Sequence, residues 1–328
     1  MAKRAVLLLA HGTPETVDQI PEYLRNVVSG RPVPQAVVEE IQHRYSLIGK
    51  SPLTEITNEQ ARMVERELAA AGQPAPVYVG MRNWRPYIPD VVKKMRAEGI
   101  EEAAVLCMAP QNSRTSVGLY RRAVEAEAGN LRIDFTSGWA QHPLLADAFA
   151  ERLQPAFQKL SAEAGKPVPV LFTAHSVPTR TVQPAADAES GPRLWPGQGA
   201  DPYAEEARHT AELVAARLPE IPKWWFAFQS QGASGGPWIG PSVEETLEQI
   251  AADGHRYLIL QPIGFLCDHV EILFDVDHLF RENAAQLGIR LERPESLNAS
   301  LPLAKAVADL AQQAFARMDA DAQQFRKL

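Results

Sequence analysis

The chain has 328 residues, of which 45% are hydrophobic and 22% are charged, and its formal net charge is −7. These values are typical of a globular protein with one large domain or two medium ones. The acidic balance gives no electrostatic support for nucleic-acid binding, so we expect no nucleic acid among its partners.

Only two cysteines are present, Cys107 and Cys267, and both lie in apolar runs. They fit reduced, buried thiols better than a disulfide or a zinc site, and two cysteines cannot hold a four-cysteine iron–sulfur cluster. The first apolar run, residues 5–10, is too short for a signal peptide or a membrane span. The sequence therefore predicts a cytoplasmic protein with no integral membrane segment and no tightly bound cofactor.

Short apolar runs alternate with helical patterns along the whole chain. In the first half, the patterns predict strands at 5–10, 77–79, 103–109 and 131–136, and helices from about 17 and at 35–45, 56–71, 86–98 and 117–128. In the second half, they predict strands at 168–173, 224–228, 256–261 and 289–291, and helices at 144–163, 203–218, 243–253, 268–278 and 301–318. This alternation indicates an α/β protein with parallel sheets flanked by helices.

The strands divide the chain into two similar halves, each with a four-stranded parallel sheet. We place the N-terminal half at residues 1–143 and the C-terminal half at 144–300, and we expect the helix of about 301–328 to pack on the N-terminal half. A cleft between two such halves is the expected ligand site. The proline-rich residues 178–202 predict a long loop near its mouth.

Residues 261–278 carry a row of metal-competent side chains. Asp268 can cap the helix that follows the strand. From there, Glu271, Asp275 and His278 follow at steps of three, four and three, which places all four on one face of an α-helix. Two interpretations stay open: a solvated acidic face, which is common, or a cation site, which the preceding strand end favours.

His175 comes directly after a buried strand. It is either a structural loop histidine or a metal ligand and proton acceptor. Because strand ends line the cleft in this architecture, His175 and the acidic row of the same half can face each other.

Two further groups are candidate ligand contacts. The glycine-rich loop 229–241 contains Trp238, which fits either a flat aromatic ligand or a structural turn with a core tryptophan. The first half supplies donors that suit carboxylates, although surface arginines are common: Arg31, Arg44, Tyr45, Ser51, Arg114 and Tyr120.

In combination, these motifs resemble those of the ferrochelatase family. The main matches are residues 173–178 (TAHSVP), 229–232 (QSQG), 237–241 (PWIGP) and 262–271 (PIGFLCDHVE). Further matches are residues 11–14 (HGTP), 44–45 (RY), 51–53 (SPL) and 108–110 (MAP). The resemblance therefore covers nearly the whole chain.

The resemblance implies two Rossmann-like halves of the chelatase class II type around a porphyrin cleft. It also implies that His175 and Glu271 form the pair at the metal-insertion centre, where Fe2+ is a substrate, and that Asp275 is an outer metal contact. The next position of that series, often acidic in relatives, is Leu279 here, and His278 is the nearest replacement.

The resemblance favours coproporphyrin III over protoporphyrin IX as the substrate, because the short chain, without a membrane-binding lip or C-terminal cysteines, looks like the coproporphyrin type of the family. His11 stands where coproporphyrin-type enzymes of the family usually have a tyrosine that approaches the iron, and a position that is histidine in some relatives is Asn83 here. The implied propionate contacts are Arg44, Tyr45, Ser51 and Tyr120, and we also expect Arg31 and Trp238 to contact the porphyrin.

Insertion of a metal requires a bent ring, the loss of two protons from it and the removal of water from Fe2+. We hypothesise that His175 accepts a proton and binds the iron early, and that Glu271 accepts the second proton or guides the metal. The alternatives are a chelatase for another metal and tetrapyrrole, or a non-catalytic haem- or porphyrin-binding protein. Enzymes before or after this step in haem biosynthesis are expected partners.

Overall fold

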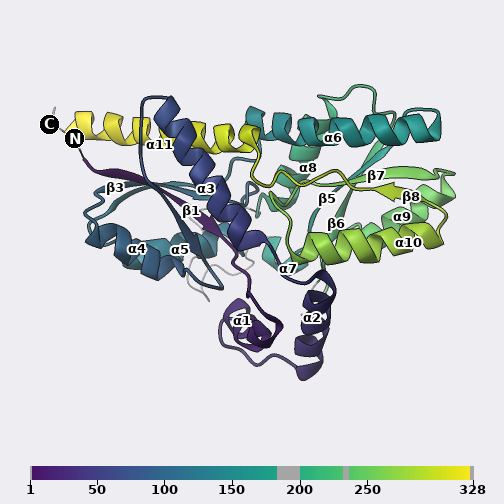
Figure 1. The fold of residues 1–328 in the computed structure, drawn as a ribbon, viewed down its shortest axis with the longest axis horizontal. Coiled ribbons are helices and arrows are strands. Elements are labelled where there is room, and N and C mark those ends of the chain that lie inside the picture. Colours follow the sequence, from purple (N-terminus) through teal and green to yellow (C-terminus); the bar gives the residue numbers. More distant parts are fainter. Residues whose placement is uncertain (1, 183–199, 232–235, 326–328) are drawn as a thin grey trace.

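Two parallel four-stranded sheets lie side by side in the computed structural model, which describes residues 2–182, 200–231 and 236–325 (Figure 1). The first sheet contains β1 (Arg4–Ala10), β2 (Val77–Met81), β3 (Glu102–Cys107) and β4 (Arg132–Thr136) in the order β2-β1-β3-β4. The second contains β5 (Val170–His175), β6 (Trp224–Gln229), β7 (Tyr257–Pro262) and β8 (Arg290–Glu292) in the order β6-β5-β7-β8. Each half thus repeats the same strand order, which confirms the predicted fold class.

Helices flank both sheets. The first half contains a 3-10 turn at Val17–Gln19, α1 (Ile20–Val27), α2 (Gln35–Ile48), α3 (Leu53–Ala70), α4 (Ile88–Ala97) and α5 (Val117–Ala128). The second contains α6 (Pro143–Ala164), α7 (Thr179–Val182), α8 (Tyr203–Ala215), α9 (Val243–Ala252), the π-helix η2 (Glu271–Phe280) and α10 (Arg281–Gln286). The short α7 lies where the sequence predicted only loop, and residues 183–199 of that stretch lie outside the described residues.

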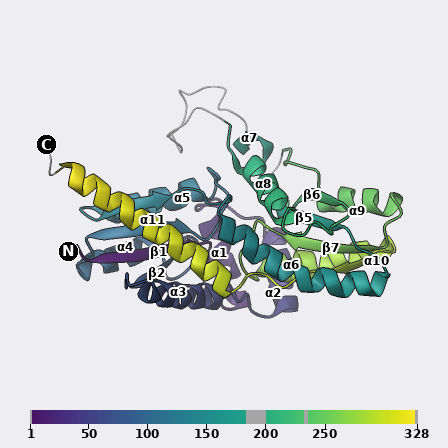
Figure 2. The ribbon, with the colours of Figure 1, turned by 90° about the horizontal axis from the view of Figure 1, so that it is seen from above.

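The last helix, α11 (Leu301–Phe325), returns to the first half. It packs against α3, β3 and β4, and it also contacts α6 of the second half (Figure 2). Arg317 on α11 forms an ion pair with Asp134 on β4, with an N–O distance of 2.7 Å. The segment that follows the second half in sequence therefore covers the sheet of the first half.

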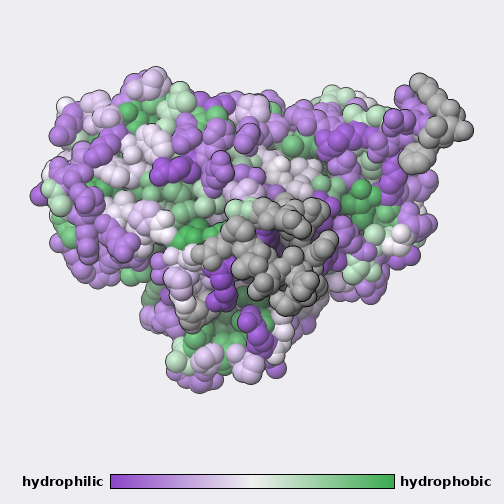
Figure 3. Space-filling model, turned by 180° about the vertical axis from the view of Figure 1, so that it is seen from behind, coloured by the Kyte–Doolittle hydropathy of each residue, from purple (hydrophilic) through white to green (hydrophobic). Residues whose placement is uncertain are grey.

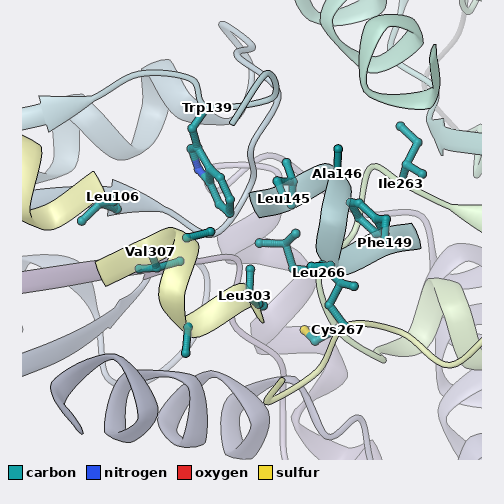
Figure 4. Packing of buried hydrophobic residues seen from close by; sticks show 14 of the residues in the cluster. Leu106, Trp139, Leu145, Ala146, Phe149, Ile263, Leu266, Cys267, Leu303 and Val307 are labelled. Carbon is teal, nitrogen blue, oxygen red and sulfur yellow. The ribbon is translucent and has the colours of Figure 1, made fainter. Parts of the chain in front are cut away.

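One hydrophobic cluster runs through both halves. It joins residues of β1 and β3 to residues of β5 and β7 through α6 and α11. Figure 4 shows Trp139, Leu145, Phe149, Leu303 and Val307 as members of this cluster. A boundary near residue 143 stays a prediction, and the buried apolar contacts across it tie the two halves together.

The helix after β7 differs from the expected α-helix. It is a π-helix that begins at Glu271, and Asp268 lies before it. The Asp268 carboxylate accepts hydrogen bonds from Arg293, Ser296 and Asn298 instead of capping a helix. The prediction that Asp268 belongs to the helical row is therefore wrong.

The π-helix also changes the rest of the row, because its backbone hydrogen bonds span five residues instead of four. His278 is exposed and stacks on Phe274, with ring centroids 6.2 Å apart. Leu279 beside it is 37% exposed. The row of four metal-competent side chains on one face does not form.

Helices α1 and α2 form a separate lobe beside the two sheets (Figure 1). The view from behind shows this lobe projecting from the body, with hydrophobic and hydrophilic surface mixed on it (Figure 3). Its small core contains Ile20, Val38 and Tyr45 and also contacts Val270, next to the π-helix. Within the described ranges, no helix combines the length and apolar character that crossing a membrane requires.

Candidate active site

A cavity of about 280 Å³ is lined by residues of both halves. Its walls come mainly from the segments that follow β1 and β3 in the first sheet and β5 and β7 in the second. In each sheet these are the two central strands. The strand order runs in opposite directions from the gap between them. Open α/β sheets bind ligands outside the carboxyl ends of such strands, so the cavity lies where both halves would place a ligand.

The cavity gathers six of the predicted site residues. Its lining includes His11, Tyr45, Ser51, Tyr120, His175 and Glu271. Four others are not part of its lining: Arg31, Arg44, Trp238 and Asp275. Arg31 is exposed and donates to the Val28 carbonyl of its own turn, and Trp238 is half-buried in a bridge with Pro178.

His175 and Glu271 meet at the cavity wall. The Nε2 atom of His175, the last residue of β5, lies 3.5 Å from Oε1 of Glu271, the first residue of the π-helix. The other ring nitrogen of His175, Nδ1, donates to the carbonyl oxygen of Ser176. A neutral His175 therefore carries its lone pair on Nε2, which faces Glu271, and an anchored Nδ1–H is the usual arrangement of a metal-binding histidine.

This pair favours opposite charges. Burial lowers the pKa of His175, but the Glu271 carboxylate outweighs it, and the net pKa is raised above 6.5. For Glu271, burial raises the pKa, while His175 and His269 hold it well below 4.5. Glu271 is therefore ionised at neutral pH and stabilises a proton on His175.

A second histidine on the other side of Glu271 was missed by the sequence reasoning. His269 Nε2 lies 3.6 Å from Oε2 of Glu271, and its Nδ1 donates to the Cys267 carbonyl over 3.0 Å. Its position two residues before Glu271 gives no helical spacing, so periodicity could not reveal it. The signal that could have revealed it is its place in the motif at 262–271, between Asp268 and Glu271, which were both selected as metal-competent residues.

His11 faces this group from the first half. Asn83 lies beside it, with Nδ2 3.0 Å from the imidazole Nε2. The pKa of His11 is lowered to about 4, mainly by desolvation in the cavity; the Glu271 carboxylate opposes this shift, and Arg82, His269 and His175 contribute to it. His11 is therefore neutral at physiological pH and presents an uncharged imidazole to the cavity.

Hydroxyl groups line the first-half wall. The hydroxyl groups of Tyr45 and Thr13 lie 2.8 Å apart and are hydrogen-bonded. Ser51 is fully buried, and its Oγ atom has no hydrogen-bond partner. Leaving a buried hydroxyl without a hydrogen-bond partner costs free energy. The Ser51 hydroxyl is therefore available to donate to an oxygen of a ligand.

Asp275 is held by hydrogen bonds from other side chains. Its carboxylate accepts from Arg44 over 3.1 Å and from the Ser230 hydroxyl. Ser230 has a φ of 62°, a left-handed conformation that is strained for serine. Arg44 also lies over the ring of Phe274, 4.9 Å from its centroid. This contact joins α2 of the lobe to the π-helix.

No three His, Cys, Asp or Glu side chains of the described residues are grouped so that they could hold a metal ion. Metal binding by His175, Glu271 and Asp275 together stays a prediction. Both cysteines are free and buried. Burial raises the pKa of Cys267 to about 12 and that of Cys107 further, so both thiols are protonated.

The fold is that of the chelatases. The sirohydrochlorin chelatase SirB from Bacillus subtilis subspecies spizizenii superposes with a TM-score of 0.56 at 10% sequence identity, covering 95% of each chain. At this identity the similarity concerns the fold alone.

Sequence comparison gives the family. The ferrochelatase family model matches residues 3–315. A ferrochelatase of Acidobacterium capsulatum is 57% identical over 322 residues, 97% of this chain and 96% of that protein. A coproporphyrin III ferrochelatase of Mycolicibacterium vanbaalenii is 35% identical over 319 residues, covering 94% of this chain and 89% of that protein. The chain belongs to the ferrochelatase family.

Replacing Arg44 by alanine should destabilise the protein by about 2 kcal/mol at pH 7, because the nearly buried Asp275 carboxylate loses a charged hydrogen-bond donor. The loss should be smaller at pH 5, since burial raises the pKa of Asp275 to about 6 and the carboxyl group can protonate. Urea unfolding measures both. Arg31→Ala is the control, because Arg31 is exposed. Equal urea midpoints for the two variants would contradict the stabilisation of Asp275 by Arg44.

The imidazole of His11 should stay neutral until the pH falls to about 4. This pKa lies below the unfolded value of about 6.5, so between these two pH values the unfolded chain binds a proton that the folded protein does not. The free energy of unfolding should therefore fall as the pH drops from about 6.5 to about 4. NMR of the His11 ring measures the titration, and the denatured protein provides the reference. Titration of the folded protein near 6.5 would contradict the desolvation of this ring by the cavity.

Proposed function

We propose that this protein is a ferrochelatase that inserts Fe2+ into a porphyrin in haem biosynthesis, with coproporphyrin III as the favoured substrate. The observation that carries the proposal is the His175–Glu271 pair, 3.5 Å apart, on the wall of a cavity between the two halves. Membership of the ferrochelatase family supports the same reaction.

In this mechanism, the two central protons of the porphyrin leave towards the second half. Nε2 of neutral His175 accepts one, because Nδ1 is occupied by the Ser176 carbonyl. The resulting imidazolium is stabilised by the Glu271 carboxylate, whose other oxygen lies near His269. From Glu271, the second proton can pass to His269 or to solvent.

The same groups suit the incoming metal. An imidazole and a carboxylate bind Fe2+ and also Zn2+, so other divalent ions are expected as alternative substrates or inhibitors. Neutral His11 on the opposite wall adds no charge that would repel the metal. Two walls with imidazoles from different halves allow a flat ring to be held between them.

Coproporphyrin III is favoured because the cavity wall is rich in donors. It carries four carboxylates, two more than protoporphyrin IX. Tyr45, Ser51 and Tyr120 present hydroxyl groups to the cavity, and hydrogen bonds to charged carboxylates are stronger than neutral ones. Arg31, Arg44 and Trp238 lie outside the cavity lining, and we propose that they contact the substrate by moving towards the cavity. We further propose a cytoplasmic location and contact with neighbouring enzymes of the haem pathway.

Replacing His175 by alanine should lower the rate of insertion by at least about 100-fold, the usual effect of losing a general base, and should leave porphyrin binding intact. Anaerobic loss of porphyrin fluorescence with Fe2+ measures the rate. His43→Ala, on the exposed surface of α2, is the control. Normal turnover by His175→Ala would refute the assignment.

The pH profile provides a second readout of the same pair. His175 must be neutral to accept a proton, so the rate should rise with pH through its raised pKa. In Glu271→Gln the attraction that raises this pKa is lost, and the acid limb should move to lower pH. An acid limb at the same pH in Glu271→Gln and the wild type would show that Glu271 does not influence the proton transfer to His175.

With the wild-type protein, kcat/KM should be higher for coproporphyrin III than for protoporphyrin IX, since more carboxylates can use the hydroxyl-rich wall. Parallel anaerobic assays with the two porphyrins measure the ratio. The variant Ser51→Ala should reduce the ratio, because it removes an otherwise unpaired donor. A preference for protoporphyrin IX would reverse the proposed substrate while leaving His175 and Glu271 in their roles.

A further inference from the structure

Arg82 is a cavity residue that the sequence analysis did not select. Within the part of the chain that the structure describes, it is the only arginine in the cavity lining, which contains no lysine. The two arginines expected to meet carboxylates, Arg31 and Arg44, lie outside this lining. The permanent positive charge at this site is therefore that of Arg82.

The backbone fixes Arg82 at the cavity wall. Arg82 directly follows β2, and its N–H donates to the Ala10 carbonyl at the end of β1 over 3.0 Å. The next residue, Asn83, donates to the His11 carbonyl over 2.9 Å. Gly12 allows this close approach: its φ is +84°, and a Cβ atom there would lie 2.9 Å from the backbone nitrogen of Trp84.

The guanidinium of Arg82 has no counter-ion among the described residues, and no hydrogen bond from it to them is found. Burial lowers its pKa, the hydroxyl groups of Tyr120 and Tyr23 raise it, and Arg122 lowers it. A guanidinium nevertheless stays charged in proteins. A half-buried cation without a partner costs free energy, and an anionic ligand would remove that cost.

Tyr120 provides a second donor in the same cavity. Its side chain is only 4% exposed, and its hydroxyl forms no hydrogen bond with a described residue. Burial raises its pKa well above 10, so the phenol keeps its proton and can donate it. A guanidinium and a phenol that both lack acceptors in the described parts of the chain suit the oxygens of one carboxylate.

We propose that Arg82, with Tyr120 as a second donor, binds a carboxylate substituent of the porphyrin inside the cavity. This inference deepens the proposed function and rests on it. The bound carboxylate would fix the rotation of the ring in its own plane, so that the central nitrogens lie between His11 and His175. Porphyrins without acidic side chains would lose this anchor.

The experiment compares Arg82→Gln with Arg85→Gln, a neighbouring variant whose arginine is exposed and lies outside the cavity lining. Binding is measured by quenching of tryptophan fluorescence with coproporphyrin III and with its tetramethyl ester, in the same dilute detergent. Arg82→Gln should weaken binding of the acid by about 30-fold, as expected when one partner of a buried charge pair is removed. It should leave binding of the ester unchanged.

Thermal unfolding distinguishes a ligand contact from a structural role. Because Arg82 has no partner among the described residues, Arg82→Gln should unfold at the same temperature as the wild type or higher, whereas loss of a structural residue would lower it. Arg82→Lys keeps the charge but not the planar fork, and it should bind the acid with intermediate affinity. It also provides the comparison if Arg82→Gln does not fold.

Equal binding of the acid by Arg82→Gln and Arg85→Gln would overturn the inference, as would an equal loss for the acid and the ester. The proposed function is tested separately by iron insertion with the wild-type protein. If the wild type inserts iron and Arg82→Gln binds the acid normally, only the inference fails. If the wild type binds the acid through Arg82 but inserts no metal, only the proposed reaction fails.

Discussion

The arrangement of the active site depends on one carboxylate placed between two imidazoles. Glu271 lies between His175 and His269, and each histidine has its Nδ1 atom fixed by a backbone carbonyl. Burying a carboxylate is unfavourable unless charged or hydrogen-bonded partners compensate it. Here the partners come from the end of β5 and from the segment after β7, so the two strands must stay in register for the charge to be tolerated.

The parallel sheets provide that register. Val170 pairs with Ile259 and Thr173 with Pro262, so β5 and β7 end close together at the same edge. Gly264 then passes directly over Ala174, where a Cβ atom would lie 3.0 Å from the Ala174 backbone. The glycine lets the segment that leads to Glu271 cross the end of the strand that carries His175. The chemistry of the pair thus depends on a backbone contact as well as on side chains.

Much of this could be predicted from the sequence. Apolar runs gave the strands, because strands buried on both faces need continuous hydrophobic residues. His175 and Glu271 were found because strand ends and a dense motif marked them. The α-helical row from Asp268 was wrong, since the hydrogen-bond pattern of a π-helix has no simple signature in hydrophobic spacing. Arg82 was missed because its importance comes from neighbours distant in sequence, which no local pattern encodes. His269 was missed because a separation of two residues from Glu271 fits no helical spacing.

The return of α11 to the first half has a consequence for synthesis of the chain. The face of the first sheet that α11 covers would remain open until the 25 residues of α11, which follow the second half in sequence, emerge from the ribosome. The two halves therefore cannot fold completely one after the other, because the first half lacks α11 until the second half has been synthesised. Failure of α11 to dock would leave an apolar sheet face exposed in a chain whose active-site residues had already been made.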